Sequence, residues 1–180
     1  MKKLFQGENG RRIAERVIFA LLVLLTALFQ NTRGALPAFG NAKAMPLVVL
    51  VAVLGLFERS LAGLFFGVFA GALWDMASAN TDSFFTVFLC VAGFLCGVLS
   101  SFVLRSNIFS ALLLSGTTTA LCLLIHWFGF LYLKGFDPAA VLLVENYLPS
   151  CIYTFLFTFV YYYLIRGIKK ALALPKRFTA

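Results

Sequence analysis

The chain has 180 residues, of which 62% are hydrophobic and only 12% are charged, and its mean hydropathy is +0.95. A soluble domain carries about a quarter charged residues, so this composition excludes a water-soluble globular protein and predicts an integral membrane protein. The net charge of +8 does not indicate nucleic-acid binding, because the basic residues lie in short flanks between apolar runs and form no stripe interleaved with stacking aromatics.

Six apolar segments are long enough, or nearly so, to cross the roughly 30 Å hydrocarbon core of a bilayer. In chain order they are 17–29 with a possible extension back to 13, then 45–57, 61–77, 84–104, 108–133 and a last one ending at 165. The second and third are short, and only the polar turn Glu58-Arg59-Ser60 separates them. The sequence predicts an all-α polytopic bundle of about six transmembrane helices, forming a single domain over residues 1–180.

A proline divides the last apolar segment. Residues 138–165 as one helix would measure about 42 Å, which is too long for a straight crossing. Pro149 also disfavours continuation of the helix before it. We therefore expect a short surface helix over 137–148, with Asp137 as N-cap, followed by a membrane span over 150–165 that ends in an aromatic and basic anchor.

The distribution of lysine and arginine predicts the orientation in the membrane. With six spans, the side that holds both termini carries twelve of these residues, and the other side carries Arg33, Lys43 and Lys134. We therefore expect cytoplasmic termini, with basic segments at 1–16 and 166–180. The basic start, an apolar run of 13 residues and the sequence GALPA also describe a cleavable signal peptide, which would leave five spans and an external N-terminus.

Glycines recur at intervals of four in the third and fourth apolar segments. They are Gly63, Gly67 and Gly71 in the third segment, and Gly93 and Gly97 in the fourth. Residues at this spacing lie on one helix face, and small residues on such a face let two membrane helices approach closely. We expect these two segments to form a tight hairpin in which the glycines are packing residues and possible partner-binding residues.

Asp75 stands four residues after the last of the three glycines, about 21 Å along its helix and inside the outer leaflet. A carboxylate there costs a few kcal/mol unless it is paired, protonated or in a wet cavity. The C-terminal end of its own helix also disfavours an anion. The candidate partners are His126, Lys134, Arg33 and Lys43. Three interpretations stay open for Asp75: a helix end that reaches water, a hydrogen bond that locks the hairpin, and part of a binding site.

The sequence contains no familiar catalytic pattern. Ser115 and His126 share a predicted helix but lie about 16 Å apart along its axis, whereas a nucleophile and its base must meet within about 3.2 Å. No phosphate-binding loop and no H-E-x-x-H motif occurs. Single cysteines without metal-ligand spacing stand at Cys90, Cys96, Cys122 and Cys151. We therefore expect a protein that is not an enzyme and that binds no metal, cofactor or nucleic acid.

Three stretches of the chain resemble the family of the rod shape-determining protein MreD. They are GLFFGVFAGALWDMASANTDSFF at 63–85, GFLCGVLSSFVLRSN at 93–107 and YLPSCIYTFLFTFVYYYLIRGIKK at 147–170. Members of that family have about this length, several spans, a G-x-x-x-G-x-x-x-D helix, and a last span that begins with proline, is rich in aromatics and ends in a basic tail. The resemblance covers most of the chain from Ala44 onward. One departure is that Ala79 and Ser83 stand where the family usually has glycines after the aspartate.

The resemblance implies a non-catalytic scaffold of the cell-wall elongation machinery in the bacterial plasma membrane. Such proteins bind the bitopic protein MreC and act with the actin-like MreB filament, a SEDS-family polymerase and its transpeptidase. By analogy the fold would be similar to the six-helix substrate-binding subunits of energy-coupling-factor vitamin transporters, which supplies an alternative function as a vitamin-binding subunit. Those subunits usually carry A-x-x-x-A on the first span, whereas Ala20 and Ala27 are seven residues apart here.

Overall fold

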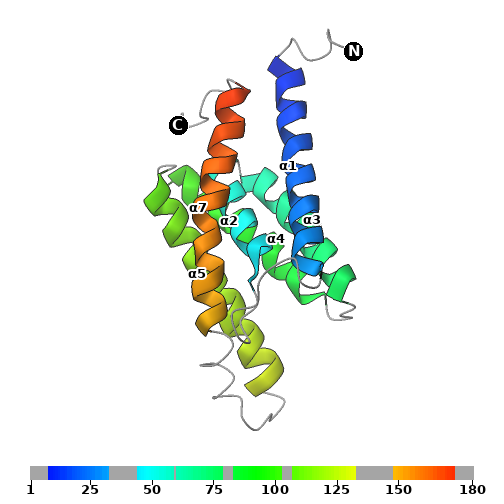
Figure 1. Ribbon diagram of the computed structural model, residues 1–180, viewed down its shortest axis with the longest axis vertical. Helices are drawn as coiled ribbons and strands as arrows, with labels where there is room; N and C mark the ends of the chain where they lie inside the picture. The colour runs from blue at the N-terminus through cyan, green and yellow to red at the C-terminus, as the bar shows by residue number, and fades with distance from the viewer. Residues whose placement is uncertain are drawn as a thin grey trace.

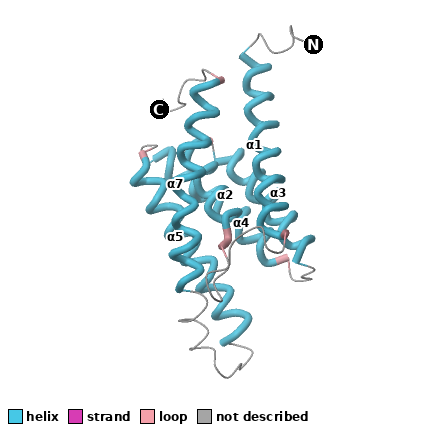
Figure 2. Tube along the Cα trace, in the orientation of Figure 1, coloured by secondary structure: helices cyan, strands magenta, loops and turns pink. Residues whose placement is uncertain are grey.

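The computed structural model describes residues 8–32, 44–58, 60–78, 83–102, 107–132 and 148–172, and all regular structure within them is helical (Figures 1 and 2). The helices are α1 (Glu8–Asn31), α2 (Pro46–Phe57), α3 (Ser60–Ser78), α4 (Phe84–Phe102), α5 (Ile108–His126), its π-helical continuation η2 (Trp127–Tyr132), and α7 (Leu148–Ala171). Five of the described helices are long and apolar enough to span a membrane. The predicted all-α polytopic fold is confirmed.

The outer surface of the bundle is apolar. Large side chains such as Phe65 on α3, Val87 on α4 and Leu121 on α5 are more than half exposed. Exposed apolar area of this extent would drive aggregation in water. In a bilayer it meets acyl chains, while the helices satisfy their own backbone hydrogen bonds.

α2 forms the axis of the bundle. Its 12 residues measure about 18 Å, which is shorter than the roughly 30 Å hydrocarbon core. Eleven of them, from Pro46 to Leu56, are buried. α2 packs against each of the other five α-helices, and Figure 1 shows it between α1 and α7. The second predicted span is therefore a short helix enclosed by protein, and the other five helices supply the full-length crossings.

The N-terminal end of α2 is capped by side chains from two other helices. The N–H of Met45 donates to Oγ1 of Thr154 on α7 at 3.0 Å, and the N–H of Leu47 donates to Oε1 of Gln30 on α1 at 3.1 Å. The first N–H groups of any helix lack partners within that helix, and water is scarce inside a membrane protein. These two bonds therefore allow a helix to begin inside the bundle.

The C-terminal end of α2 is capped in the same way. The hydroxyl of Ser100 on α4 donates to the carbonyl of Leu56 at 2.6 Å, and Nζ of Lys169 on α7 donates to the carbonyl of Phe57 at 2.7 Å. The ammonium also lies at the negative end of the helix dipole, which favours a cation.

Lys169 also joins α1 to the turn between α2 and α3. Its Nζ lies 2.6 Å from Oε1 of Glu58 and 3.1 Å from Oε1 of Glu15, and the three side chains are at most 19% exposed. The contact with Glu15 is an ion pair without hydrogen-bond geometry. Glu15 and Lys169 lie in the parts of α1 and α7 that extend beyond the predicted apolar runs, and their contact joins these two helical extensions.

The start of α1 and the end of α7 lie at the same end of the molecule (Figure 1). Residues 8–16 and 166–171 of the predicted basic segments belong to these helices. α7 begins at Leu148, so Pro149 occupies its first turn, where a missing N–H costs nothing. The surface helix expected over 137–148 falls almost wholly outside the described residues.

Candidate functional site

The most extensive helix contact in the described part of the chain is between α3 and α4. Gly63 and Gly93 face each other so closely that a Cβ on either would collide with the carbonyl oxygen of the other. A Cβ on Gly67 would collide with the carbonyl of Leu89. These contacts are between backbones, so no side-chain rotation can relieve them. The face carrying these glycines is therefore used inside the protein and is not open to a partner.

Gly71 extends the contact between α3 and α4 at one end, whereas Gly97 lies in a contact of α4 with α2. A Cβ on Gly71 would collide with the backbone of Thr86 at the start of α4. Gly97 faces Gly55 of α2. A Cβ added to Gly55 would lie 3.3 Å from the Gly97 nitrogen and 2.8 Å from the Cβ of Cys96. Gly55 did not stand out in the sequence, because it has no glycine partner at a spacing of four.

Asp75 caps the first turn of α4 from the end of α3. Its Oδ2 accepts hydrogen bonds from the N–H of Thr86 at 2.8 Å and from the hydroxyl of Thr86 at 2.6 Å, and its Oδ1 accepts one from the N–H of Phe85 at 3.3 Å. The residue is buried, with 7% exposure. An N-cap side chain normally belongs to the residue just before its helix. Here a neighbouring helix supplies it.

This arrangement answers the electrostatic problem that the sequence posed. The N-terminal end of α4 carries a partial positive charge, which offsets the unfavourable C-terminal end of α3. Of the three interpretations left open by the sequence, the hydrogen bond that locks the hairpin agrees with these contacts, because backbone N–H groups and a hydroxyl of α4 hold the carboxylate. His126 instead stacks on the ring of Phe85, with centroids 5.8 Å apart. The other candidates, Arg33, Lys43 and Lys134, lie outside the described residues.

Ser83 occupies the usual N-cap position of α4 in an unusual conformation. Its φ is +46°, in the left-handed region that favours glycine. This is one of the two places where the MreD family usually has glycine. With Asp75 supplying the cap, the backbone at Ser83 is free to turn the chain into α4, at the cost of conformational strain.

Stacked rings cover the capped turn. The ring of Trp74 lies on that of Phe85 with centroids 4.0 Å apart and planes within 3°, and His126 follows on the side of α5. Phe84 meets the same imidazole edge-on at 5.8 Å. We call Trp74, Asp75, Ser83, Phe85 and Thr86 the hairpin end. Its aromatic layer shields the hydrogen bonds of Asp75 from competing water, which strengthens them.

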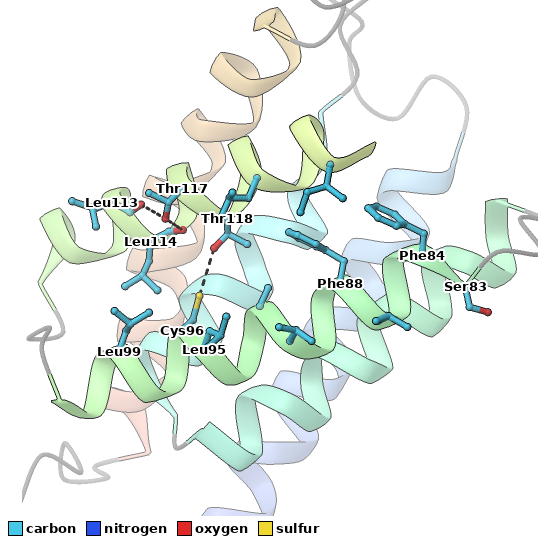
Figure 3. A pocket seen from close by; sticks show the side chains of 15 residues that line it. Ser83, Phe84, Phe88, Leu95, Cys96, Leu99, Leu113, Leu114, Thr117 and Thr118 are labelled. Atoms are coloured by element: carbon cyan, nitrogen blue, oxygen red, sulfur yellow. Dashed lines mark hydrogen bonds between the residues drawn. The ribbon is translucent and has the colours of Figure 1, made fainter. Parts of the chain in front are cut away.

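A groove of about 800 Å³ runs between α4 and α5, which have few contacts with each other (Figure 3). Its walls are mostly leucine, valine and phenylalanine side chains. On α4 they run from Ser83 to Leu99, and on α5 from Leu113 to Ile125. One end of the groove therefore reaches the hairpin end, and the other approaches the start of α5.

The polar side chains that line the middle of this groove are bonded within the protein. The hydroxyl of Thr117 donates to the carbonyl of Leu113 at 2.8 Å, and Thr118 Oγ1 lies 3.5 Å from Sγ of Cys96 (Figure 3). A water-soluble vitamin needs several convergent polar groups for recognition. These two threonines do not supply them.

The residues considered as catalytic or metal-binding candidates are characterised by their contacts within the protein. The hydroxyl of Ser115 lies 2.7 Å from that of Thr158 on α7, so it joins two helices. The four cysteines are free thiols. Within the described ranges, no group of three His, Cys, Asp or Glu side chains is placed to hold a metal ion.

Thr86 and Lys169 are the site and core residues that sequence reasoning missed. Thr86 is the third residue of α4, where a hydroxyl gives no signal by itself. In the sequence Lys169 looked like a membrane-surface anchor. Its contact with Phe57 gives no sequence signal, because the two positions are 112 residues apart.

The fold and the hairpin end define a polytopic α-helical membrane protein whose two most closely packed helices are fixed to each other by glycines and a buried carboxylate. No protein-family model matches the chain, and no curated protein or solved structure is significantly similar to it. The resemblance to the MreD family therefore rests on the sequence motifs alone, and the likeness to vitamin-transporter subunits rests on analogy with that family.

Proposed function

We propose that this protein is a non-catalytic scaffold of the bacterial cell-wall elongation machinery, and that it helps to maintain rod shape by binding an MreC-like bitopic partner. The observation that carries the proposal is the capping of α4 by Asp75. The G-x-x-x-G-x-x-x-D motif is the main point of resemblance to the MreD family, and its aspartate holds a helix end at 2.6–2.8 Å from Thr86. The motif therefore has a physical task that suits a scaffold.

Rigidity is what that task provides. The glycines bring the backbones of α3 and α4 together along their length. Asp75 holds the end of α3 to the start of α4, so the two helices cannot move apart at this end. A partner that docks on a pre-organised surface loses less conformational entropy than one that must order it. In our proposal the hairpin end presents its surroundings to the partner in one geometry, and both basic termini face the cytoplasmic MreB filament. The SEDS polymerase and its transpeptidase belong to the same cell-wall synthesis complex.

Co-purification tests the proposal directly. The full-length protein, expressed with an MreC-like protein from the same cells, should retain it through detergent extraction, and an unrelated bitopic protein should be lost. Asp75→Leu should weaken retention and round up rod-shaped cells, whereas the neighbouring exposed Met76→Leu should do neither.

The alternative, a vitamin-binding transporter subunit, predicts a different set of results. Cells lacking the protein would keep their shape and lose uptake of one nutrient, and a small molecule would co-purify with the wild-type protein. That outcome, together with no retention of an MreC-like protein by the folded wild type, would refute the scaffold proposal.

A further inference from the structure

The charges that join α1, α7 and the turn between α2 and α3 do not balance. Two carboxylates, those of Glu15 and Glu58, lie 3.1 and 2.6 Å from a single ammonium, that of Lys169. Among the described residues, the charges that act on Glu15 are those of Glu58 and Lys169. With both carboxyl groups ionised, this cluster would carry one negative charge in excess.

The other charged groups near this end of the bundle belong to α1 and α7. Arg12 and Arg16 are on α1, and Arg16 is exposed. Arg166 on α7 lies over the ring of Tyr162 and donates to its hydroxyl at 3.4 Å. α2 has no charged residue, and the one on α3, Asp75, lies at the far end of that helix. None of these groups acts on Glu15 as a second cation.

The carboxyl group of Glu15 is buried and incompletely bonded. The residue is 7% exposed, and its Oε1 has no hydrogen-bond partner among the described residues. A carboxylate removed from water is costly unless it is paired and hydrogen-bonded, and two carboxyl groups that share a site favour the uptake of a proton by one of them. A protonated carboxyl is also a donor, and Glu58 lies within hydrogen-bonding reach. One proton would therefore remove the excess charge and supply the missing bond.

We propose that Glu15 and Glu58 hold one proton between them at neutral pH, which makes the contact of α1 with the α2–α3 turn sensitive to pH. Neither the MreC-like partner nor the scaffold role is needed for this inference. The proton comes from water at this end of the bundle and forms an O–H bond on one carboxyl group, and no other covalent bond changes. When the proton leaves at higher pH, the two carboxylates repel each other across the contact, and α1 is held less firmly.

The pH dependence of unfolding tests this proposal. The glutamates of the unfolded chain lose their protons near about pH 4.3, so above this pH the folded protein holds one proton more than the unfolded chain. The stability of the folded protein then falls as the pH rises. The full-length wild type and Glu15→Gln are unfolded reversibly in mixed micelles between about pH 5.5 and 7. We expect the unfolding equilibrium constant of the wild type, relative to that of Glu15→Gln, to rise about tenfold for each pH unit.

Two further variants complete the comparison. Glu58→Gln leaves one carboxylate and one ammonium, so it should remove the same pH dependence, and it replaces Glu15→Gln should that variant fail to fold. Lys170→Met, at the exposed neighbour of Lys169, is the control and should keep the wild-type dependence. A purely structural role of Glu15 would change the constant by the same factor at every pH. The wild-type dependence in a folded glutamine variant would overturn the proposal, since another cation would then neutralise the second carboxylate.

Infrared spectroscopy of the folded wild type detects the proton directly. A protonated carboxyl has a carbonyl band that a carboxylate lacks and that shifts in D₂O. This band should be present at neutral pH, disappear at higher pH and be lost in Glu15→Gln. Its absence from the wild type at neutral pH, or its persistence in Glu15→Gln, would contradict the shared proton.

Discussion

Asp75 and Thr86 are joined by two hydrogen bonds to a single carboxylate oxygen: Oδ2 of Asp75 lies 2.8 Å from the Thr86 nitrogen and 2.6 Å from its hydroxyl oxygen. One side chain in the last turn of α3 thereby caps the start of α4 and fixes the two helices to each other at this end. The G-x-x-x-G-x-x-x-D sequence that ends in Asp75 can thus be understood as joining two helices.

Removing this cap should destabilise the protein in graded steps. Asp75→Leu leaves two backbone N–H groups and a hydroxyl without an acceptor, and we expect a loss of about 2 kcal/mol in the free energy of unfolding. Asp75→Asn keeps one acceptor but loses the charge at the helix N-terminus, so about 1 kcal/mol should be lost. Thermal unfolding in detergent measures both. Met76→Leu is the control, and an Asn variant as unstable as the Leu variant would contradict the capping role.

The glycine contacts should not tolerate even one methyl group. Gly67→Ala places its Cβ against the carbonyl of Leu89, so the helices must move apart, at a cost of about 2–3 kcal/mol. Gly167→Ala is the matched control, because nothing lies within 4 Å of its Cβ position on α7. It should be neutral or stabilising by about 0.5–1 kcal/mol through helix propensity. Similar melting temperatures for the two variants would show that α3 and α4 are not packed in this way.

Glycine at position 83 should stabilise the protein. The φ of +46° at Ser83 is strained for any residue with a Cβ, so Ser83→Gly should gain about 1 kcal/mol. Ser83→Ala removes the hydroxyl but retains the Cβ, and it should leave stability nearly unchanged. Unfolding of the two variants side by side separates backbone strain from the loss of a hydroxyl. A gain with alanine and none with glycine would contradict the strain.

Loss of the Lys169 ammonium should be more harmful than loss of a carboxylate beside it. Lys169→Met leaves two carboxylates and the carbonyl of Phe57 without their cation. We expect the free energy of unfolding to fall by about 2–3 kcal/mol, which is less than for a fully buried ion pair because this cluster is partly exposed. Glu15→Gln removes one of two anions that share a single cation, and it should change stability by less than about 0.5 kcal/mol. Lys170→Met is the exposed control. If Glu15→Gln proved as harmful as Lys169→Met, Glu15 would be an essential part of the cluster.

The basic residues predict the orientation, and cysteine labelling can test it. In a background with Cys90 and Cys151 replaced by alanine, Thr32→Cys and Ser83→Cys should react with a membrane-impermeant reagent added outside intact cells. Asn107→Cys should react only after lysis. All three positions are exposed at helix ends. External labelling of Asn107→Cys would invert the predicted topology.

Several features of this protein follow from the sequence because they depend on local composition. The membrane helices are visible as apolar runs, since crossing a bilayer requires a continuous stretch of apolar residues whatever surrounds it. The spacing of Gly63, Gly67 and Gly71 predicts a face for close approach, since the helical period alone places them together. The position of Asp75 likewise predicts that something must compensate a buried carboxylate.

Only the tertiary structure decided which residues those features contact. The partner of Asp75 is the start of a helix, and this depends on how closely the glycines let α3 and α4 approach. α2 looks like a short span in the sequence, but its ends are satisfied by Thr154, Gln30, Ser100 and Lys169, which come from three other helices. The α4–α5 groove exists because α4 and α5, neighbours in the chain, pack on α2 more than on each other. Apolar length and helical period are properties of one segment, whereas caps, ion pairs and grooves depend on which segments become neighbours, and that is fixed only when the whole bundle packs.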